Sequence, residues 1–133
     1  MTQHREVPVK VNAWADEGIA DLVSALSELE GLITLESCQG DVGEREAFVI
    51  FQYGDWRQCG ELLFGKILLA MSPDMRAAVS LKLQAYDNDT ASGFISIDPS
   101  AVPDFVDCIR GVLSAAVSAR VFVTRDTHSK AVA

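Results

Sequence analysis

The sequence predicts an α+β two-layer sandwich, in which about five mostly antiparallel strands carry three helices on one face. Two patterns lead to this fold class. Segments in which apolar and polar residues alternate are typical of strands with one buried face, and segments with an apolar residue every three or four positions are typical of amphipathic helices. The order of these segments matches a ferredoxin-like βαββαβ core followed by a hairpin strand and a helix.

The chain of 133 residues is expected to fold as a single domain over residues 1–133. Residues 125–133, approximately, are expected to form a flexible tail, as the ends of chains often do. Leu22 and Phe105 lie on the apolar stripes of the first and third predicted helices. Both are therefore candidate core residues.

The first half of the chain is expected to hold a strand, a helix and two further strands. Alternation over Val7–Trp14 predicts the first strand, and Asp16 is a capping residue for a helix that Gly31 ends. The second strand is Leu32–Cys38. The third, Ala47–Tyr53, is apolar on both faces, which is typical of a central strand.

A second helix is predicted after the third strand. Asp55 and Gln58 have the spacing of a capping box, which is a signal for the start of a helix. Trp56 and Cys59 belong to the apolar stripe of this helix, so both are expected to face the core. The helix is expected to end before Pro73.

The last third of the chain predicts a hairpin and a helix. Val79–Tyr86 and Ala91–Ile97 are the two strands, joined by a turn at Asp87–Asp89. Asp98–Ser100 has the residue types that start a helix. Arg120–Thr124 is a candidate for one more short strand.

The charge balance argues against several classes of partner. The chain has 11 Lys and Arg against 19 Asp and Glu, a formal net charge of −8. Nucleic-acid binding depends on clustered cations, and here they are scattered, so neither nucleic acid nor an anionic membrane is an expected partner. No apolar run approaches the ~18 residues of a membrane helix. The start of the sequence has no hydrophobic signal segment, so a cytoplasmic location is expected.

The cysteines and histidines do not predict a metal or a cofactor. Cys38, Cys59 and Cys108 are an odd set with no closely spaced pair, which is typical of free thiols in a reducing cytoplasm. His4 and His128 lie near the two ends of the chain, and no spacing resembles a zinc site. The expectation is therefore no metal and no cofactor.

One candidate binding site follows the second predicted strand. The strand ends where a glycine turn begins, and a thiol in that position can act as a nucleophile if its pKa is lowered. The nearby carboxylates of Glu36 and Glu44 would instead raise that pKa, so no catalytic residue is assigned. The alternative is a plain turn whose polar side chains satisfy local backbone groups. The candidate residues are Ser37, Cys38, Gln39, Gly40 and Asp41.

This segment also carries a resemblance to known proteins. The helix from Asp16 to Leu26, then Gly31, then Glu-Ser-Cys-Gln-Gly-Asp at residues 36–41 resembles a group of small bacterial and phage-borne proteins. More distantly, it is similar to the tRNA wybutosine-synthesising methyltransferase family, whose corresponding segment ends in Ser-Cys-Ser-Gly-Arg. Only Ser37, Cys38 and Gly40 match that family, which has Ser and Arg at the positions of Gln39 and Asp41. The resemblance covers about a fifth of the chain.

A second candidate site is the sheet face that the helices do not cover. In the strand Leu32–Cys38, Ile33 and Leu35 are expected on one side, and Thr34, Glu36 and Cys38 on the uncovered side. Large apolar groups on an uncovered sheet more often mark a protein interface than an RNA-stacking surface. The residues expected in this interface are Trp14, Tyr53, Tyr86 and Phe94.

These observations favour a small cytoplasmic, non-catalytic binding domain. It would bind a protein or a small-molecule ligand through the uncovered sheet face or the Ser37–Asp41 loop, and a homodimer through that face is the expected assembly. The alternative is an enzyme that acts on a nucleotide-like or RNA substrate near Ser37–Asp41. Binding of RNA by the uncovered sheet is a third hypothesis.

Overall fold

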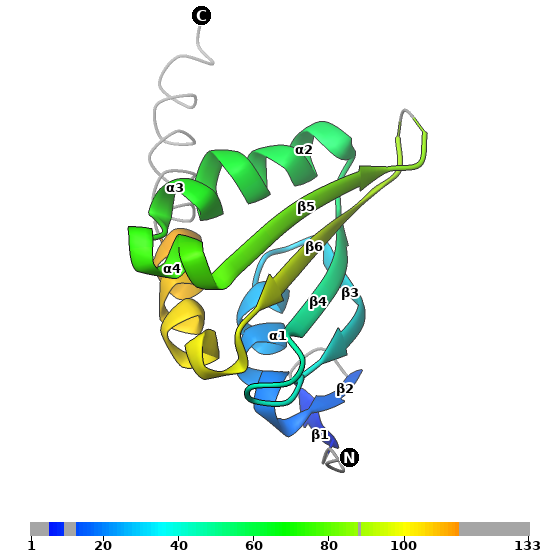
Figure 1. Ribbon diagram of the computed structural model, residues 1–133. Helices are drawn as coiled ribbons and strands as arrows, with labels where there is room; N and C mark the ends of the chain where they lie inside the picture. Colours follow the sequence, from blue (N-terminus) through cyan, green and yellow to red (C-terminus); the bar gives the residue numbers. More distant parts are fainter. Residues whose placement is uncertain (1–5, 10–12, 88, 115–133) are drawn as a thin grey trace, which may run out of the picture.

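The computed structural model describes residues 6–9, 13–87 and 89–114, with side chains from Asp16 onward. It confirms the α+β class. Four antiparallel strands form a sheet in the order β3-β4-β6-β5, and helices pack against one of its faces (Figure 1). These strands are β3 (Leu32–Cys38), β4 (Ala47–Tyr53), β5 (Val79–Ala85) and β6 (Ala91–Ile97). Their bounds agree closely with those predicted.

The predicted first strand is instead a hairpin. β1 (Glu6–Val9) and β2 (Ala13–Asp16) pair antiparallel with each other, so that Pro8 lies opposite Trp14. They form a separate two-stranded sheet, and β6 is the neighbour of β4 in the main sheet. A ferredoxin-like core would place the first strand inside the main sheet. That part of the prediction is wrong, because alternation of period two continues unchanged through a chain reversal.

The first helical segment follows β2 directly. A 3-10 turn, η1 (Glu17–Ile19), leads into α1 (Ala20–Ser27), whose buried side is apolar. Gly31 follows the helix with a φ of 90°, a left-handed conformation that favours glycine. α1 itself ends at Ser27 with Glu28 as its C-cap, so the helix stops before Gly31, which lies in the turn to β3.

The second helical segment consists of three parts in sequence. α2 (Trp56–Gly60) continues into the π-helical η2 (Glu61–Ile67) and then α3 (Leu68–Ala70). The predicted capping box is confirmed, because the Gln58 N–H donates to the Asp55 carboxylate at 2.9 Å and the Asp55 N–H donates to the Gln58 side chain at 3.0 Å.

A short helix that was not predicted, α4 (Pro73–Ala78), precedes β5. The signal for it was present, since Ser72 caps the helix by accepting the Met75 N–H at 3.2 Å and Pro73 occupies its first turn. After β6, Asp98 caps the 3-10 turn η3 (Pro99–Ala101), which opens the helix over residues 102–114. The predicted strand Arg120–Thr124 and tail 125–133 lie outside the described residues.

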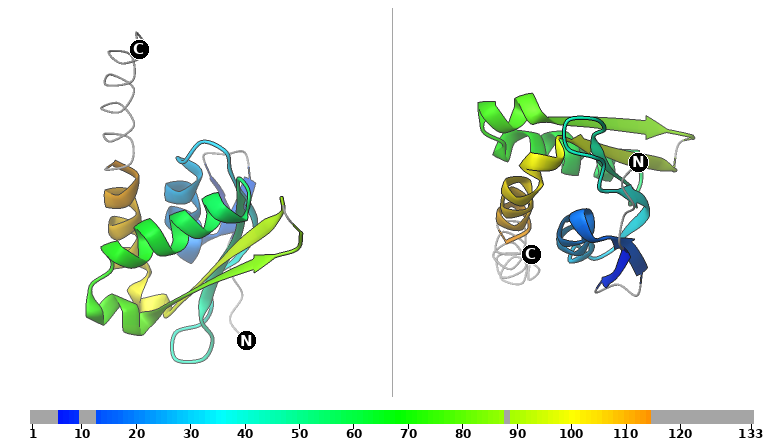
Figure 2. Two further views of the ribbon diagram at one scale, coloured as in Figure 1. Left: turned by 90° about the horizontal axis from the view of Figure 1, so that it is seen from above. Right: turned by 60° about the horizontal axis from the view of Figure 1, so that its bottom comes forward.

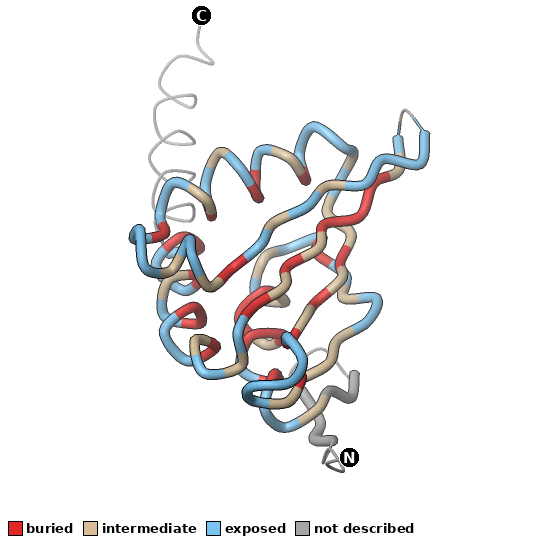
Figure 3. Tube along the Cα trace, in the orientation of Figure 1, coloured by how far each residue is buried: buried red, intermediate tan, exposed pale blue. Residues whose placement is uncertain are grey.

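The core lies between the main sheet and the helices. Seen from above, α1, the α2–α3 segment and the helix over 102–114 lie on the same side of the sheet (Figure 2). Buried residues occur in every strand of the main sheet, in α1, in the α2–α3 segment and in the helix over residues 102–114 (Figure 3). Leu22 and Phe105 are both fully buried, which confirms them as core residues. Among the described helices, none has the length and apolarity needed to cross a membrane.

Candidate functional site

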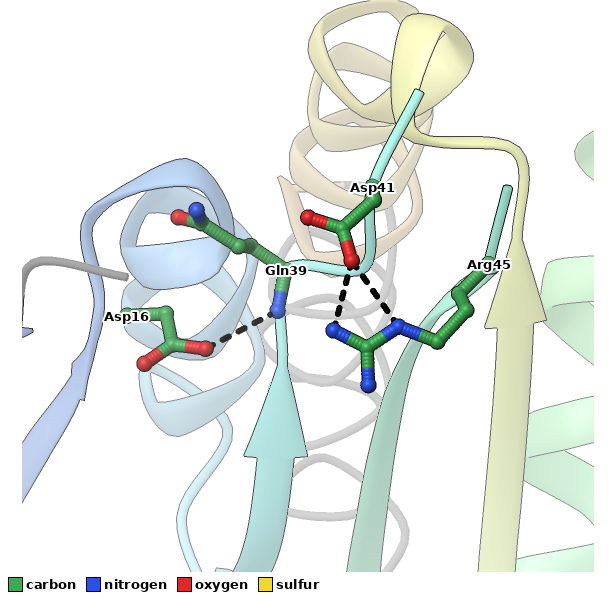
Figure 4. Close-up of polar contacts among 4 residues, drawn as sticks. All are labelled: Asp16, Gln39, Asp41 and Arg45. Carbon is green, nitrogen blue, oxygen red and sulfur yellow. Dashed lines mark hydrogen bonds and ion pairs between the residues drawn. The ribbon is translucent and has the colours of Figure 1, made fainter. Parts of the chain in front are cut away.

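The Ser37–Asp41 segment ends β3 and begins the loop to β4, and it is hydrogen-bonded to the start of the first helical segment. The Gln39 N–H donates to the Asp16 carboxylate at 3.2 Å (Figure 4). The Gly18 N–H donates to the Gln39 side-chain oxygen at 2.7 Å. The Asp16 side chain makes no capping bond to η1, in contrast to the predicted capping role. Gln39 therefore ties two segments together that lie more than 20 residues apart in the sequence.

Gly40 fits a position that no other residue can occupy without strain. Its φ is 67°, and a Cβ atom built on it would lie 2.5 Å from the Arg45 carbonyl oxygen and 2.6 Å from the Glu46 carbonyl carbon. Both contacts are with backbone, which cannot move aside as a side chain can. The glycine in the motif is therefore explained by the close approach of two chain segments.

Asp41 holds the far side of the same loop. Its carboxylate accepts from Arg45 Nε at 2.9 Å and from Arg45 Nη2 at 2.6 Å (Figure 4). The Asp41 side chain is only 9% exposed, against 52% for Arg45, and the hydrogen bond with Asp41 raises the pKa of the Arg45 guanidinium. The backbone of Asp41 also pairs with that of Arg45 in an isolated bridge. This ion pair closes the connection between β3 and β4.

The five predicted site residues do not converge on one point. Ser37 lies opposite the buried Val49 on the helix side of the sheet, whereas Cys38 lies opposite Phe48 on the other side. Gln39, Gly40 and Asp41 are engaged within the chain, as described above. The Gln39 side chain bonds to backbone 21 residues away and the Asp41 carboxylate bonds to a side chain, so the segment differs from a turn whose polar side chains satisfy local backbone groups.

The face of the sheet turned away from the helices is called the open face. No helix or strand among the residues that the structure describes covers it (Figures 1 and 2). Pairing of the strands assigns its residues, since directly opposite residues point to the same side of a sheet. They are Ile33, Glu36 and Cys38 on β3, Phe48, Ile50 and Gln52 on β4, Ser92, Phe94 and Ser96 on β6, and Ser80, Lys82 and Gln84 on β5.

A β-bulge corrects the predicted orientation of β3. The pairing with β4 shifts between Thr34 and Glu36, so Leu35 is the additional residue. Thr34 therefore shares the core side with Phe51, and Ile33 turns to the open face, where it is 59% exposed. Leu35 at the bulge is 51% exposed. The prediction had the sides of Ile33 and Thr34 reversed, because a bulge changes the side on which alternating residues lie.

One row of residues crosses the open face from edge to edge. Glu36 lies opposite Ile50, Ile50 opposite Phe94, and Phe94 opposite Lys82. The Lys82 Nζ atom lies 5.4 Å from the centroid of the Phe94 ring, within reach of a cation–π interaction. This central row (Glu36, Ile50, Phe94 and Lys82) has a negative end, an apolar middle and a positive end.

The four predicted interface residues have different outcomes. Phe94 lies on the open face and is half-buried, and Tyr86, which follows β5, is 56% exposed. Tyr53 lies opposite Leu32 and packs against the core, so its placement on the uncovered face is wrong. The side chain of Trp14 lies outside those described. Because β4 is apolar on both faces, its sequence could not show which side the helices cover.

Other exposed apolar residues lie on the second helical segment and were not predicted. Trp56 is 40% exposed rather than buried, and Arg57 lies 5.1 Å from its ring. Phe64 and Leu69, in the same helical segment, are 40% and 69% exposed. Their signal was weak, because this helix is apolar around much of its circumference and π-helical turns change the angular position of each residue.

The cysteines are free thiols with different surroundings. Cys59 is fully buried, as predicted, and burial raises its pKa to about 11. Cys108 is partly exposed, and burial raises its pKa as well. Within residues 6–9, 13–87 and 89–114, no three His, Cys, Asp or Glu side chains gather as a metal site would require.

The chain matches no protein-family model, no curated protein and no solved structure at a significant level.

Proposed function

We propose that this chain is a non-catalytic binding domain whose open face binds a protein. The observation that carries the proposal is the run of apolar side chains on that face. Ile33 is mostly exposed, and Phe48, Ile50 and Phe94 are half-buried. An antiparallel sheet with one covered face ordinarily has polar residues on the other, so apolar residues there indicate a contact surface.

The composition of the face supports a protein as the partner. An aromatic and aliphatic centre with charged groups at its margin is the usual anatomy of a protein–protein interface. The central row contributes one carboxylate and one ammonium group, at opposite ends, and the chain as a whole has a net charge of −8. An RNA-stacking sheet would instead surround its aromatic residues with cations.

The Ser37–Asp41 loop supports a structural role rather than catalysis. Gln39 is hydrogen-bonded to Asp16 and Gly18, and the Asp41 carboxylate is hydrogen-bonded to Arg45, so these contacts all lie within the chain. A substrate that needed these groups would have to break bonds that hold β3 to its neighbours. We place this binding function in the cytoplasm, where the free thiols of the chain are stable.

Site-specific photo-crosslinking in cells that make the full chain tests the proposal. A photoreactive residue replaces Ile33 on the open face or, as the matched control, Leu69 on α3, which is equally aliphatic and exposed. We expect covalent protein adducts from position 33 and far fewer from position 69. The adducts should disappear when Phe94→Asp is added to the position 33 variant.

Adducts from position 69 alone would assign binding to the helix side and overturn the proposal. An absence of adducts from both positions would overturn it as well, provided that circular dichroism shows the variants to be folded.

A further inference from the structure

We infer that the partner of the open face is a second copy of this chain, related by a two-fold axis parallel to the strands. This inference rests on the proposed function, because it names the partner of the same surface. It is carried by the order of charges along the central row, which makes the open face complementary to itself.

The two charged groups of the row lie at opposite edges of the sheet. Glu36 is on β3 and Lys82 is on β5, and these are the outer strands in the order β3-β4-β6-β5. Strands lie about 4.8 Å apart, so the two residues are separated by about 14 Å within one copy. Both are exposed. Glu36 and Lys82 are therefore too far apart to form an ion pair with each other within one copy.

A two-fold axis along the strands, between β4 and β6, places each row against its own reverse. Glu36 of each copy then faces the partner's Lys82, and Ile50 faces the partner's Phe94. The dimer then contains two Glu36–Lys82 pairs, one at each end of the row, and the apolar residues in the middle are covered. An axis across the strands would place Glu36 against the partner's Glu36 and Lys82 against the partner's Lys82. Like charges in contact disfavour that alternative.

The area of the sheet indicates a reversible dimer. Four strands of seven residues give a flat face of roughly 19 Å by 23 Å, or about 440 Å² for each copy. Two such faces together amount to about 880 Å², which is below the ~1,200–2,000 Å² of stable specific interfaces and within the range of weak, transient ones. Leu35 and Tyr86 at the margins add exposed apolar surface. The dimer should therefore depend on concentration, rather than persist as an obligate assembly.

The test measures mass by sedimentation equilibrium between about 1 and about 300 µM, a range that covers micromolar dissociation constants. The wild-type chain should approach twice its monomer mass of 14.4 kDa as the concentration rises. Glu36→Lys alone and Lys82→Glu alone each put two pairs of like charges into the dimer. We expect each variant to weaken association at least about tenfold.

Mixing these two variants is the decisive step. In a dimer of one Glu36→Lys chain with one Lys82→Glu chain, opposite charges face each other at both ends of the row. The mixture should therefore associate about as well as the wild type, although each variant alone is largely monomeric. Rescue on mixing also shows that both variants are folded.

The outcomes separate this inference from the proposed function. A wild-type mass that stays at 14.4 kDa overturns the dimer, and so does a mixture that fails to associate or a dimer that neither charge reversal weakens. If the wild type is monomeric while position 33 still forms adducts with other proteins, the proposed function stands and only self-association fails. If position 33 forms no adducts and the chain is monomeric, both fail.

Discussion

Replacing Gly40 with alanine should destabilise the protein far more than the same change at Gly43. Both glycines lie in the loop between β3 and β4 and have positive φ, 67° and 78° respectively. They differ in what surrounds them. A Cβ atom at Gly40 would meet the backbone of Arg45 and Glu46 at 2.5–2.6 Å, whereas one at Gly43 would have no atom within 4 Å.

These distances set the expected magnitudes. Alanine in the left-handed region costs about 1–2 kcal/mol, and the loss of unfolded-state freedom offsets about 0.4–1 kcal/mol of it. Gly43→Ala should therefore cost about 1 kcal/mol. Gly40→Ala adds the displacement of two backbone segments, comparable to an overpacked core at ~1–3 kcal/mol, for a total of about 3 kcal/mol.

Urea unfolding followed by circular dichroism measures both variants, at one protein concentration because dimerisation would add to the apparent stability. The difference between the two variants should be about 2 kcal/mol. A difference below about 0.5 kcal/mol, which is within the usual scatter of surface substitutions, would refute the close packing of Gly40 and with it the structural role of the loop.

Three further predictions concern stability. Leu22→Ala and Phe105→Ala each remove a fully buried side chain and should cost about 2–5 kcal/mol in urea unfolding; losses below about 1 kcal/mol at both would contradict the packing of the helices on the sheet. The pKa of the Cys59 thiol is raised from 9.0 to about 11, so the thiol stays protonated in the folded chain while it ionises in the unfolded chain. The stabilisation that the protonated Cys59 thiol gives the folded state is fully present below pH 9, and about 2–3 kcal/mol of it is lost by pH 11. The stability of the wild type should therefore fall more steeply over this pH window than that of Cys59→Ala. Equal slopes would contradict the burial of Cys59. Asp55→Ala removes the capping box with Gln58 and should cost about 1 kcal/mol, with Asp55→Asn retaining most of the stability; no loss in Asp55→Ala would argue against the cap.

Most elements of the fold could be predicted because their signals are local. The capping box of Asp55 and Gln58, the turn at Gly31 and the bounds of β3 to β6 each depend on a few neighbouring residues. The topology could not be obtained in this way. Which strand lies beside β4, and the reversal between β1 and β2, depend on contacts between segments that are distant in sequence or equal in pattern.

In the candidate sites, too, features with a local sequence signal could be predicted, and features that depend on distant residues could not. The sequence located the Ser37–Asp41 loop, but the bond between the Gly18 N–H and Gln39 joins residues 21 positions apart and has no local signal. The bulge at Leu35 reversed the expected sides of Ile33 and Thr34, since one additional residue shifts the alternation of the strand. The space that the Phe51 ring fills beside Gly93 also had no local signal, since the ring lies where a side chain at position 93 would be.

The most direct test asks whether the open face becomes covered in solution. Methyl-labelled NMR with a soluble paramagnetic agent compares Ile33 on the open face with Leu69 on α3, which are 59% and 69% exposed in the monomer. At about 10 µM the agent should broaden both methyl signals similarly, and at about 500 µM, where a dimer with a dissociation constant of about 50 µM is largely formed, it should broaden Ile33 much less while Leu69 is unchanged. Equal broadening of the two residues at both concentrations would contradict the assignment of the open face as the surface where two copies meet.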